Sequence, residues 1–329
     1  MRVAITGGAG YVGSALVPYL IDLGHEVTVL DLFLYGENVF NGLRQPGRLA
    51  CVKGDIRNPA DLAKAFKGAE AVIHLACISN DPSFELDPHL GKSINYDAFA
   101  KILAAVRGCG ARRFIYASSS SVYGVQDVPN VREDTPCLPL TDYSKFKLLC
   151  EQDLQAADLG GCERVVIRPA TVCGYAPRMR LDLTVNILSI HALVRKLITV
   201  HGGGQLRPNI NIRDMIEAYR ILLEAPADKV AGQTFNAGYE NHSVADIAEM
   251  VRAEVRDPAV QIKVEPTVDN RSYHINSDRI ANLLGFRARH TIRDAVRSIC
   301  DAYAGGLMPD PMGDRRYYNI KTMQAVGLR

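Results

Sequence analysis

The chain begins with a short apolar run and a glycine-rich turn, Val3-Ala4-Ile5-Thr6-Gly7-Gly8-Ala9-Gly10-Tyr11-Val12-Gly13. Residues 3–6 predict a strand and residues 11–23 a helix, so the glycines lie at a strand–turn–helix junction. There, backbone N–H groups and the helix N-terminus face an anion, and a side chain at Gly10 would block the approach of a pyrophosphate. The turn therefore predicts a dinucleotide site formed by Gly7, Gly10, Tyr11, Val12 and Gly13.

Beyond this turn, the first half of the chain alternates β-rich runs with helical patterns. We expect further strands at residues 26–31, 49–53, 71–75, 113–118 and 164–168. We expect further helices at residues 59–66, 88–107 and 143–157. Alternation of this kind predicts an α/β fold with a Rossmann-like, doubly wound parallel sheet.

The pattern changes after Arg168-Pro169, where Pro, Gly and Asn become frequent. Helical patterns recur at residues 183–196, 213–224, 244–255, 278–284 and 292–303. We interpret residues 1–168 as the nucleotide-binding domain and residues 169–308 as a smaller C-terminal α/β substrate domain, and we allow for segments that return to the first domain. Residues 309–329 form a tail with no clear period, to which we assign no role.

Composition argues against several classes of protein. Of the 329 residues, 47% are hydrophobic and 22% are charged, which is typical of a folded globular chain. A formal net charge of +2 is too small for a dedicated nucleic-acid binder, and the sequence has no run of 18 apolar residues that would predict a membrane span. The apolar run at residues 3–5 begins too close to the N-terminus for a secretory signal, so we expect a cytoplasmic protein.

Neither the cysteines nor the histidines predict a metal site. The eight cysteines include no C-x-x-C pair, and the eight histidines include no H-x-x-x-H spacing. We therefore expect free thiols in a reducing compartment and no bound metal.

Asp31 ends the second expected strand, about 20 residues after the glycine turn, which is where a dinucleotide site carries its ribose-binding acid. Its carboxylate would accept hydrogen bonds from the adenosine ribose and would repel a 2′-phosphate. The following residues, Leu32-Phe33-Leu34, offer no arginine to hold that phosphate. We therefore predict NAD rather than NADP as the cofactor.

A serine-rich strand end, Ser118-Ser119-Ser120-Ser121, is followed by Tyr143-Ser144-Lys145-Phe146-Lys147. Tyr143 and Lys147 are four residues apart, so on a helix their side chains share one face. A nearby ammonium favours the phenolate, and lowering a tyrosine pKa from 10 toward 7 requires about 4 kcal/mol. The pair thus predicts a base that works at neutral pH, although the spacing alone is also compatible with an ordinary helix face.

Taken together, these motifs resemble those of one family. The glycine turn, His74-Leu75-Ala76-Cys77, the serine-rich strand end with Val122-Tyr123-Gly124, and Tyr143/Lys147 follow the order of extended short-chain dehydrogenases/reductases. Over roughly residues 1–304 the chain resembles the NAD-dependent nucleotide-sugar epimerase/dehydratase family. The resemblance implies that Tyr143 is the base, that Lys147 holds the nicotinamide ribose, and that Ser119 bonds the reacting hydroxyl.

The resemblance also implies further cofactor contacts. Ser118 is the alternative to Ser119 and is otherwise expected beside the cofactor. Asp55 and Ile56 match the family's adenine-contacting segment, and Leu75 and Ala76 match the backbone beneath the ribose. Asn95 is kept from the family's N-x-x-G-T element, but the Gly-Thr is absent, which leaves the role of Asn95 open.

Three residues of the second half resemble the family's contacts to a nucleoside-diphosphate sugar. Asn186 and Arg207, the latter in Gly202-Gly203-Gly204-Gln205-Leu206-Arg207, would bind the diphosphate, and Arg271 would do so from residues 269–273. A helix-surface asparagine and surface ion pairs remain the alternatives. The family further implies a homodimer that pairs through the helices at residues 88–107 and 143–157.

The type of reaction depends on the two residues after Ser119. In the 4,6-dehydratases that the chain resembles, these residues are Asp and Glu, and decarboxylating relatives also place a glutamate there. Here they are Ser120 and Ser121, so dehydration lacks its acid and base. We therefore predict a C4 epimerase, with an NAD(P)H-dependent 4-ketosugar reductase as the alternative. A non-catalytic NAD-binding scaffold is disfavoured because Ser119, Tyr143 and Lys147 are all present.

Overall fold

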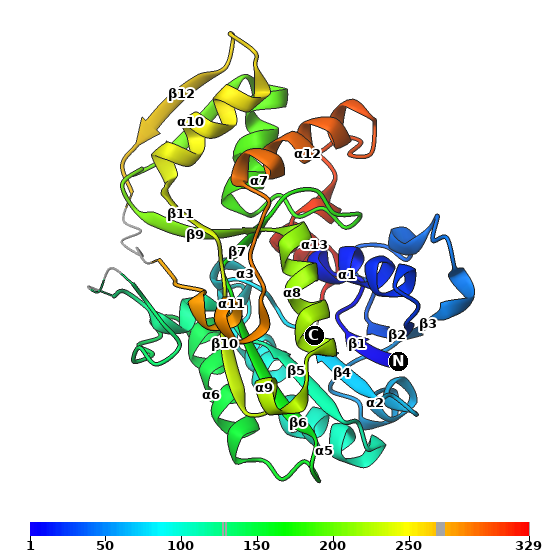
Figure 1. The fold of residues 1–329 in the computed structure, drawn as a ribbon. Coiled ribbons are helices and arrows are strands. Elements are labelled where there is room, and N and C mark those ends of the chain that lie inside the picture. The colour runs from blue at the N-terminus through cyan, green and yellow to red at the C-terminus, as the bar shows by residue number, and fades with distance from the viewer. Residues whose placement is uncertain (127, 129, 268–273, 329) are drawn as a thin grey trace.

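The computed structural model describes residues 1–126, 128, 130–267 and 274–328, and its centre is a seven-stranded sheet in which every neighbouring pair is parallel (Figure 1). The strand order is β10-β6-β5-β4-β1-β2-β3. The strands are β1 (Arg2–Thr6), β2 (Glu26–Asp31), β3 (Leu49–Lys53), β4 (Ala71–His74), β5 (Arg113–Ala117), β6 (Glu163–Pro169) and β10 (Gln233–Ala237). The chain order reverses between β1 and β4, which confirms the predicted doubly wound arrangement and puts a ligand crevice at their carboxyl ends.

Helices cover both faces of this sheet because its strands are apolar on both sides. α1 (Tyr11–Asp22) and α8 (Ile212–Glu224) lie side by side on one face, and Leu16 and Met215 share a core there with Ile5 (Figure 1). α2 (Pro59–Phe66), α5 (Phe99–Cys109) and α6 (Asp142–Ala156) form the opposite core with Ala4 and Phe114. The neighbours Ala4 and Ile5 thus point to opposite faces, as strand geometry requires.

The expectation of one continuous helix over residues 88–107 is wrong. The chain there forms α4 (Pro88–Lys92), a π-helical turn η3 (Ser93–Asp97) and then α5. At this turn Asn95 accepts a hydrogen bond from the Ile78 amide at 2.8 Å and donates one to the Ile78 carbonyl at 2.9 Å. Residues 93–97 contain no Pro or Gly that would mark a break, so the sequence did not reveal the change of winding. The helix expected at residues 183–196 similarly divides into α7 (Thr184–Ile190) and a π turn η5 (His191–Arg195).

The second half of the chain builds two small sheets and a third core. The first sheet has the order β11 (Glu240–Ser243), β9 (Leu206–Asn211), β7 (Thr171–Cys173), and the second pairs β12 (Gln261–Glu265) with β8 (Leu197–His201). α7, α10 (Val244–Val255) and α12 (Ile292–Ala304) pack around Val185, Ile247 and Val296. β10 lies outside these small sheets and extends the main sheet beside β6, so the second half contributes a strand to the first.

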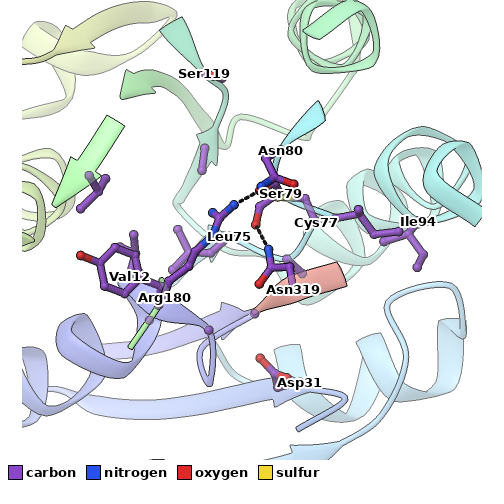
Figure 2. Close-up of a pocket in the computed structure, with 18 of the residues that line it drawn as sticks. Val12, Asp31, Leu75, Cys77, Ser79, Asn80, Ile94, Ser119, Arg180 and Asn319 are labelled. Atoms are coloured by element: carbon purple, nitrogen blue, oxygen red, sulfur yellow. Dashed lines mark hydrogen bonds between the residues drawn. The ribbon is translucent and has the colours of Figure 1, made fainter. Parts of the chain in front are cut away.

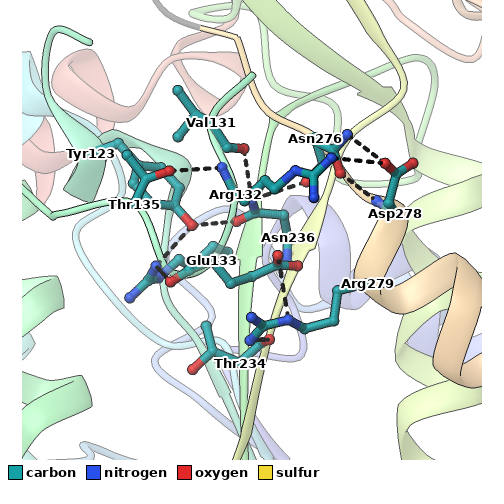
Figure 3. Close-up of polar contacts among 11 residues, drawn as sticks. Tyr123, Val131, Arg132, Glu133, Thr135, Thr234, Asn236, Asn276, Asp278 and Arg279 are labelled. Atoms are coloured by element: carbon teal, nitrogen blue, oxygen red, sulfur yellow. Dashed lines mark hydrogen bonds and ion pairs between the residues drawn. The ribbon is translucent and has the colours of Figure 1, made fainter. Parts of the chain in front are cut away.

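Polar contacts at β10 hold the loop that follows Tyr123 (Figure 3). The Asn236 amide N–H donates to Glu133 at 2.8 Å, and the Asn236 side chain donates to the carbonyls of Val131 and Asn276. Arg279, from α11 (Asp278–Leu284), lies 3.5 Å from Glu133. Two segments that are far apart in the sequence are thereby fixed against one strand of the main sheet.

Residues 309–328, which show no clear period in the sequence, are folded. They contain a short turn η6 (Arg315–Tyr317) and a helix α13 (Asn319–Val326), and Met323 belongs to the core beneath α5 and α6. The Leu181 amide donates to the Tyr317 carbonyl at 2.9 Å. The remaining short helices and turns are η1 (Asn38–Phe40), η2 (Pro46–Arg48), α3 (Asp81–Glu85), η4 (Ser120–Tyr123) and α9 (Ala227–Val230). Within the described ranges, no helix is long and apolar enough to cross a membrane.

Candidate active site

A cavity of about 350 Å³ opens at the carboxyl ends of the central strands, where the strand order reverses. All fourteen residues that the sequence assigned to the cofactor or to catalysis line this cavity. They are Gly7, Gly10, Tyr11, Val12, Gly13, Asp31, Asp55, Ile56, Leu75, Ala76, Ser118, Ser119, Tyr143 and Lys147. Six separate stretches of sequence therefore converge on one site, and the roles assigned to these residues can be considered from their geometry.

The glycine turn has the close backbone contacts that a phosphate cradle needs. Gly7 has a φ of +73°, and a Cβ there would lie 2.6 Å from the backbone of Ala76. A Cβ on Gly13 would lie 2.4 Å from the Gly8 carbonyl oxygen, so only glycine lets α1 start this close to the turn. The N-terminus of α1 consequently faces the cavity and can bind an anionic diphosphate.

Asp31 is held at the end of β2 by two backbone amides. Its carboxylate accepts hydrogen bonds from Ala9 at 3.0 Å and from Phe33 at 2.8 Å. Burial raises the pKa of Asp31, and these two amides oppose that rise. The carboxylate lines the same cavity as the glycine turn, so the two features predicted for a dinucleotide lie in one site.

The N-terminus of α6 presents Tyr143 and Lys147 to the cavity. Thr141 and Ser144 form a capping box that starts the helix, and the Thr141 hydroxyl also donates to Asp81 at 2.6 Å. Lys147 is 4% exposed, and its Nζ donates to the Ala117 carbonyl at 2.7 Å. Its ammonium lies 6.0 Å from the centroid of the Tyr143 ring. The predicted pair therefore shares one helix face beside the end of β5.

The Tyr143 hydroxyl is hydrogen-bonded to Ser119. Ser119 Oγ accepts from the Ser121 amide at 3.1 Å and from the Ser121 hydroxyl at 2.9 Å, so its own proton remains for Tyr143 or for a substrate hydroxyl. Burial raises the pKa of Tyr143 well above its ordinary value, and Cys77 adds to that rise. The charge of Arg180 and the bond from Ser119 act in the opposite direction, so a cation besides Lys147 favours the phenolate.

Ser118 has a different partner from Ser119. Its hydroxyl donates to Glu151, which forms a buried ion pair with Arg168 at 2.6 Å. Arg168 also donates to the Tyr123 hydroxyl at 2.8 Å. The structure thus directs the hydroxyl of Ser118 toward the protein interior and leaves Ser119 as the serine bonded to Tyr143.

Two arginines in the cavity were not found from the sequence. Arg178 and Arg180 follow β7 in a loop, and both guanidinium groups line the cavity, as Figure 2 shows for Arg180. Arg180 pairs with Asp182 at 2.7 Å and donates to the Ser79 carbonyl. Both residues lie more than 160 positions beyond the glycine turn, and only the sequence Pro177-Arg178-Met179-Arg180 marks them.

Asn186 lies outside the cavity lining and is fully buried. It accepts from the Gly174 amide at 3.0 Å and donates to the Arg180 carbonyl at 2.8 Å and to the Tyr11 hydroxyl at 3.2 Å. Tyr11 in turn donates to the Gly174 carbonyl at 2.5 Å. Asn186 thus holds both ends of the loop that carries the two arginines, and its expected place beside a diphosphate stays a prediction.

Of the two predicted substrate arginines, Arg207 is not among the described residues that line the cavity. Arg207 is on β9, opposite His242 of β11, and donates to the Leu206 carbonyl at 3.1 Å. Arg271 belongs to residues 268–273, which lie outside the described part of the chain. Their assignment to the substrate diphosphate stays a prediction.

Comparison with known proteins identifies relatives that are similar to this chain over nearly its whole length. A 27% identical relative, a UDP-glucose 4-epimerase of Corynebacterium glutamicum, is matched over 96% of this chain and 98% of its own. UDP-glucuronic acid decarboxylase 1 of Arabidopsis thaliana is 30% identical over 95% of this chain and 72% of its own. A solved UDP-glucuronic acid 4-epimerase of Bacillus cereus, in complex with UDP-glucuronic acid and NAD, has a TM-score of 0.83 at 25% identity and covers 93% of this chain and 99% of its own.

The model of the NAD dependent epimerase/dehydratase family matches residues 3–238, which include the glycine turn, Asp31, Ser119, Tyr143 and Lys147. This match confirms the resemblance predicted from the motifs and confirms NAD as the cofactor. Because this family model covers most of its length, the chain belongs to the NAD dependent epimerase/dehydratase family.

Proposed function

We propose that this protein epimerises a nucleoside-diphosphate sugar at C4 through a transient 4-keto sugar. The observation that carries the proposal is the hydrogen-bonded pair Ser119 and Tyr143 beside Lys147, next to a strand end where positions 120 and 121 are serines. Such a site can move one proton and one hydride, and it has no carboxylate at the two positions where dehydratases and decarboxylating relatives carry theirs.

Each residue of the pair has a defined task in this reaction. Tyr143 accepts the proton of the C4 hydroxyl and later returns it, and Ser119 donates a hydrogen bond that stabilises the oxygen as it loses that proton. Lys147 keeps a positive charge close to the phenol. NAD held in this cavity would supply the hydride chemistry that epimerisation at C4 needs.

The hydrogen bonds at the serine-rich strand end support an epimerase over a dehydratase. Ser121 donates to Ser119, so it orients the serine that is bonded to the base. Among the described residues that line the cavity, the carboxylates are Asp31, Asp55 and Asp81. Asp55 is paired with Arg57 at 2.6 Å and Asp31 is held by backbone amides, while Asp81 accepts from Thr141. Water elimination needs an acid on the sugar side, and this set does not supply one at positions 120 and 121.

The relatives guide the choice of substrate. Several of them are UDP-glucose 4-epimerases, so UDP-hexoses are the first sugars to offer, followed by GDP-, CDP- and dTDP-sugars. Nucleotide and cofactor released by gentle denaturation of the purified protein should be identified by chromatography and mass spectrometry. These nucleotide sugars are then incubated with the native protein without added cofactor.

We expect retained NAD and a product isomeric with its substrate. A product that has lost water would show a 4,6-dehydratase, and one that has lost carbon dioxide would show a decarboxylase. Conversion of a 4-ketosugar only when NAD(P)H is added would show the reductase instead. Tyr143→Phe is the matched control, because it removes the hydroxyl and should lower turnover by about 10²–10⁴-fold while the retained NAD stays the same.

A further inference from the structure

The C-terminal segment, residues 309–328, reaches the cofactor cavity. Asn319, Met323 and Leu328 line the same cavity as the glycine turn and Asp31. Thr322 and Met323 are 1% and 5% exposed, so α13 is packed into the protein. Figure 2 shows Asn319 close to Ser79, above the part of the site that holds Asp31.

The side chain of Asn319 connects two walls of the cavity. It is 3% exposed, its Oδ1 accepts from Arg178 Nη2 at 2.5 Å, and its Nδ2 donates to Ser79 Oγ at 3.2 Å. Ser79 belongs to the loop after β4, and Arg178 belongs to the loop after β7. The amide therefore couples both loops to the C-terminal helix.

Arg178 is held over the adenosine half of the cavity. Its amide N–H donates to Ser14 Oγ at 3.0 Å, in the first turn of α1, and its guanidinium lies 3.6 Å from the centroid of the Tyr35 ring. The guanidinium of Arg178 also interacts electrostatically with the carboxylate of Asp31. Arg178 thus lies beside the first turn of α1, whose N-terminus can bind a diphosphate, and its charge interacts with Asp31, the predicted ribose-binding residue.

One donor of this guanidinium has no partner within the described structure. Arg178 Nε is buried and makes no hydrogen bond, although the residue is only 4% exposed. A buried unpaired N–H is costly, and a guanidinium is a strong donor to phosphate oxygens. Arg178 also lines the cavity, and the dinucleotide supplies anionic oxygens that a guanidinium can bind there.

We propose that the C-terminal segment is part of the NAD site, with Arg178 binding the adenosine–diphosphate half of NAD and Asn319 positioning the guanidinium. Arg178 contacts the cofactor in this assignment, whereas Asn319 acts through Arg178 and Ser79. The proposal concerns the cofactor and does not depend on which sugar the enzyme uses.

The test measures dissociation constants of NAD⁺ and of ADP-ribose by calorimetry on protein freed of NAD. ADP-ribose is included because it carries the adenosine and the diphosphate but no nicotinamide. Asn319→Leu and Arg178→Met should each weaken both ligands by about ten-fold or more, the loss expected for one charge-assisted hydrogen bond. The double variant should lose little more than the worse single variant, because both changes remove the same contact. Gln324→Ala, at an exposed position on the same helix, is the matched control and should bind as wild type does.

Two results would overturn the proposal. One is that Asn319→Leu lowers the unfolding temperature of the NAD-free protein but leaves both dissociation constants within about two-fold of Gln324→Ala, which would make the contact merely structural. The other is full additivity of the two changes in the double variant. If Asn319→Leu does not fold, Arg178→Lys is measured instead, because it keeps the positive charge but removes the forked N–H donors of the guanidinium. Unchanged binding of NAD⁺ and ADP-ribose to Arg178→Lys would also reject the assignment.

Discussion

The hydroxyl of Ser118 donates to Glu151, whereas the hydroxyl of its neighbour Ser119 is bonded to Tyr143. Two adjacent serines at the end of one strand thus have opposite surroundings, one in a buried ion-pair network and the other beside the base. This relationship is compatible with the sequence-based choice of Ser119 over its alternative, Ser118.

Alanine substitutions should distinguish the two serines. Ser119→Ala should lower kcat by about 10²-fold or more with little change in stability, because a group that acts on the reacting hydroxyl is lost. Ser118→Ala should lower the free energy of unfolding by about 1–3 kcal/mol, because Glu151 loses a partner in the interior, and its kcat should fall less. Steady-state kinetics and urea unfolding of both variants provide the measurement. The reverse pattern would make Ser118 the catalytic serine.

Arg180 should set the pH dependence through Tyr143. Burial raises the pKa of Tyr143 and the charge of Arg180 lowers it, so Arg180→Met should raise that pKa further. A smaller fraction of phenolate at a given pH then moves the rise of kcat/KM to higher pH, by about one unit for each 1.36 kcal/mol of lost interaction. Profiles measured between about pH 6 and 10 test this. Arg180→Lys retains the charge and should keep the wild-type profile. A higher KM with an unshifted profile would instead show that Arg180 binds the substrate.

Substitution of Asp31 should change the choice between NAD⁺ and NADP⁺. Asp31→Ser removes the charge that repels a 2′-phosphate, while Arg178 remains available near that position. The ratio of the two dissociation constants should move toward NADP⁺ by about ten- to a hundred-fold, the range for a charge-assisted hydrogen bond. In Asp31→Ser/Arg178→Met this gain should be lost. NADP⁺ binding that stays as weak as in the wild type would show that the negative charge of Asp31 is not what excludes it.

His74 should make stability fall at mildly acidic pH. It is buried, its ring nitrogen is hydrogen-bonded to Thr6 at 2.6 Å, and burial followed by the charge of Lys147 lowers its pKa from 6.5 to about 3. The unfolded chain binds the proton and the folded chain does not, so its contribution is complete above pH 6.5 and is lost as the pH falls from 6.5 toward 3. Between pH 7 and pH 5 this loss is about 2 kcal/mol.

Urea unfolding at pH 7 and at pH 5 measures this effect. His74→Gln should reduce the difference between the two free energies of unfolding by about 2 kcal/mol, whereas His201→Gln, at an exposed site, should leave it unchanged. Equal pH dependence of wild type and His74→Gln would mean that other groups cause the acid loss.

The sequence predicted the parts of this protein that depend on local pattern. The strands of the first half and the residues around Gly7, Asp31 and Tyr143 follow from apolar runs and short motifs with a physical requirement. Helix continuity was predicted wrongly at Ser93–Asp97, because these residues contain no Pro or Gly that would mark a break.

Other parts depend on distant contacts that no local pattern encodes. Arg178 enters the cavity only because the loop after β7 packs on α1, and Asn319 only because the C-terminal helix docks there. Asn186 resembled a substrate ligand by motif, but its amide is occupied by the backbone of the loop it supports. A motif identifies which residue type occupies a position, whereas burial decides which partner its side chain meets.

Asn95, at the π turn, binds both the amide and the carbonyl of Ile78, as a neighbouring strand would. Because this contact recognises main-chain atoms only, it does not depend on the side chains of the loop that follows β4. Cys77, which lines the cavity from that loop, can therefore be exchanged for another residue without loss of this contact. The side chains of Ser79 and Asn80, in contrast, bond Asn319 and Asp182. Cys77 is thus a suitable place to redesign the selectivity of the pocket, provided that Asn95 is retained.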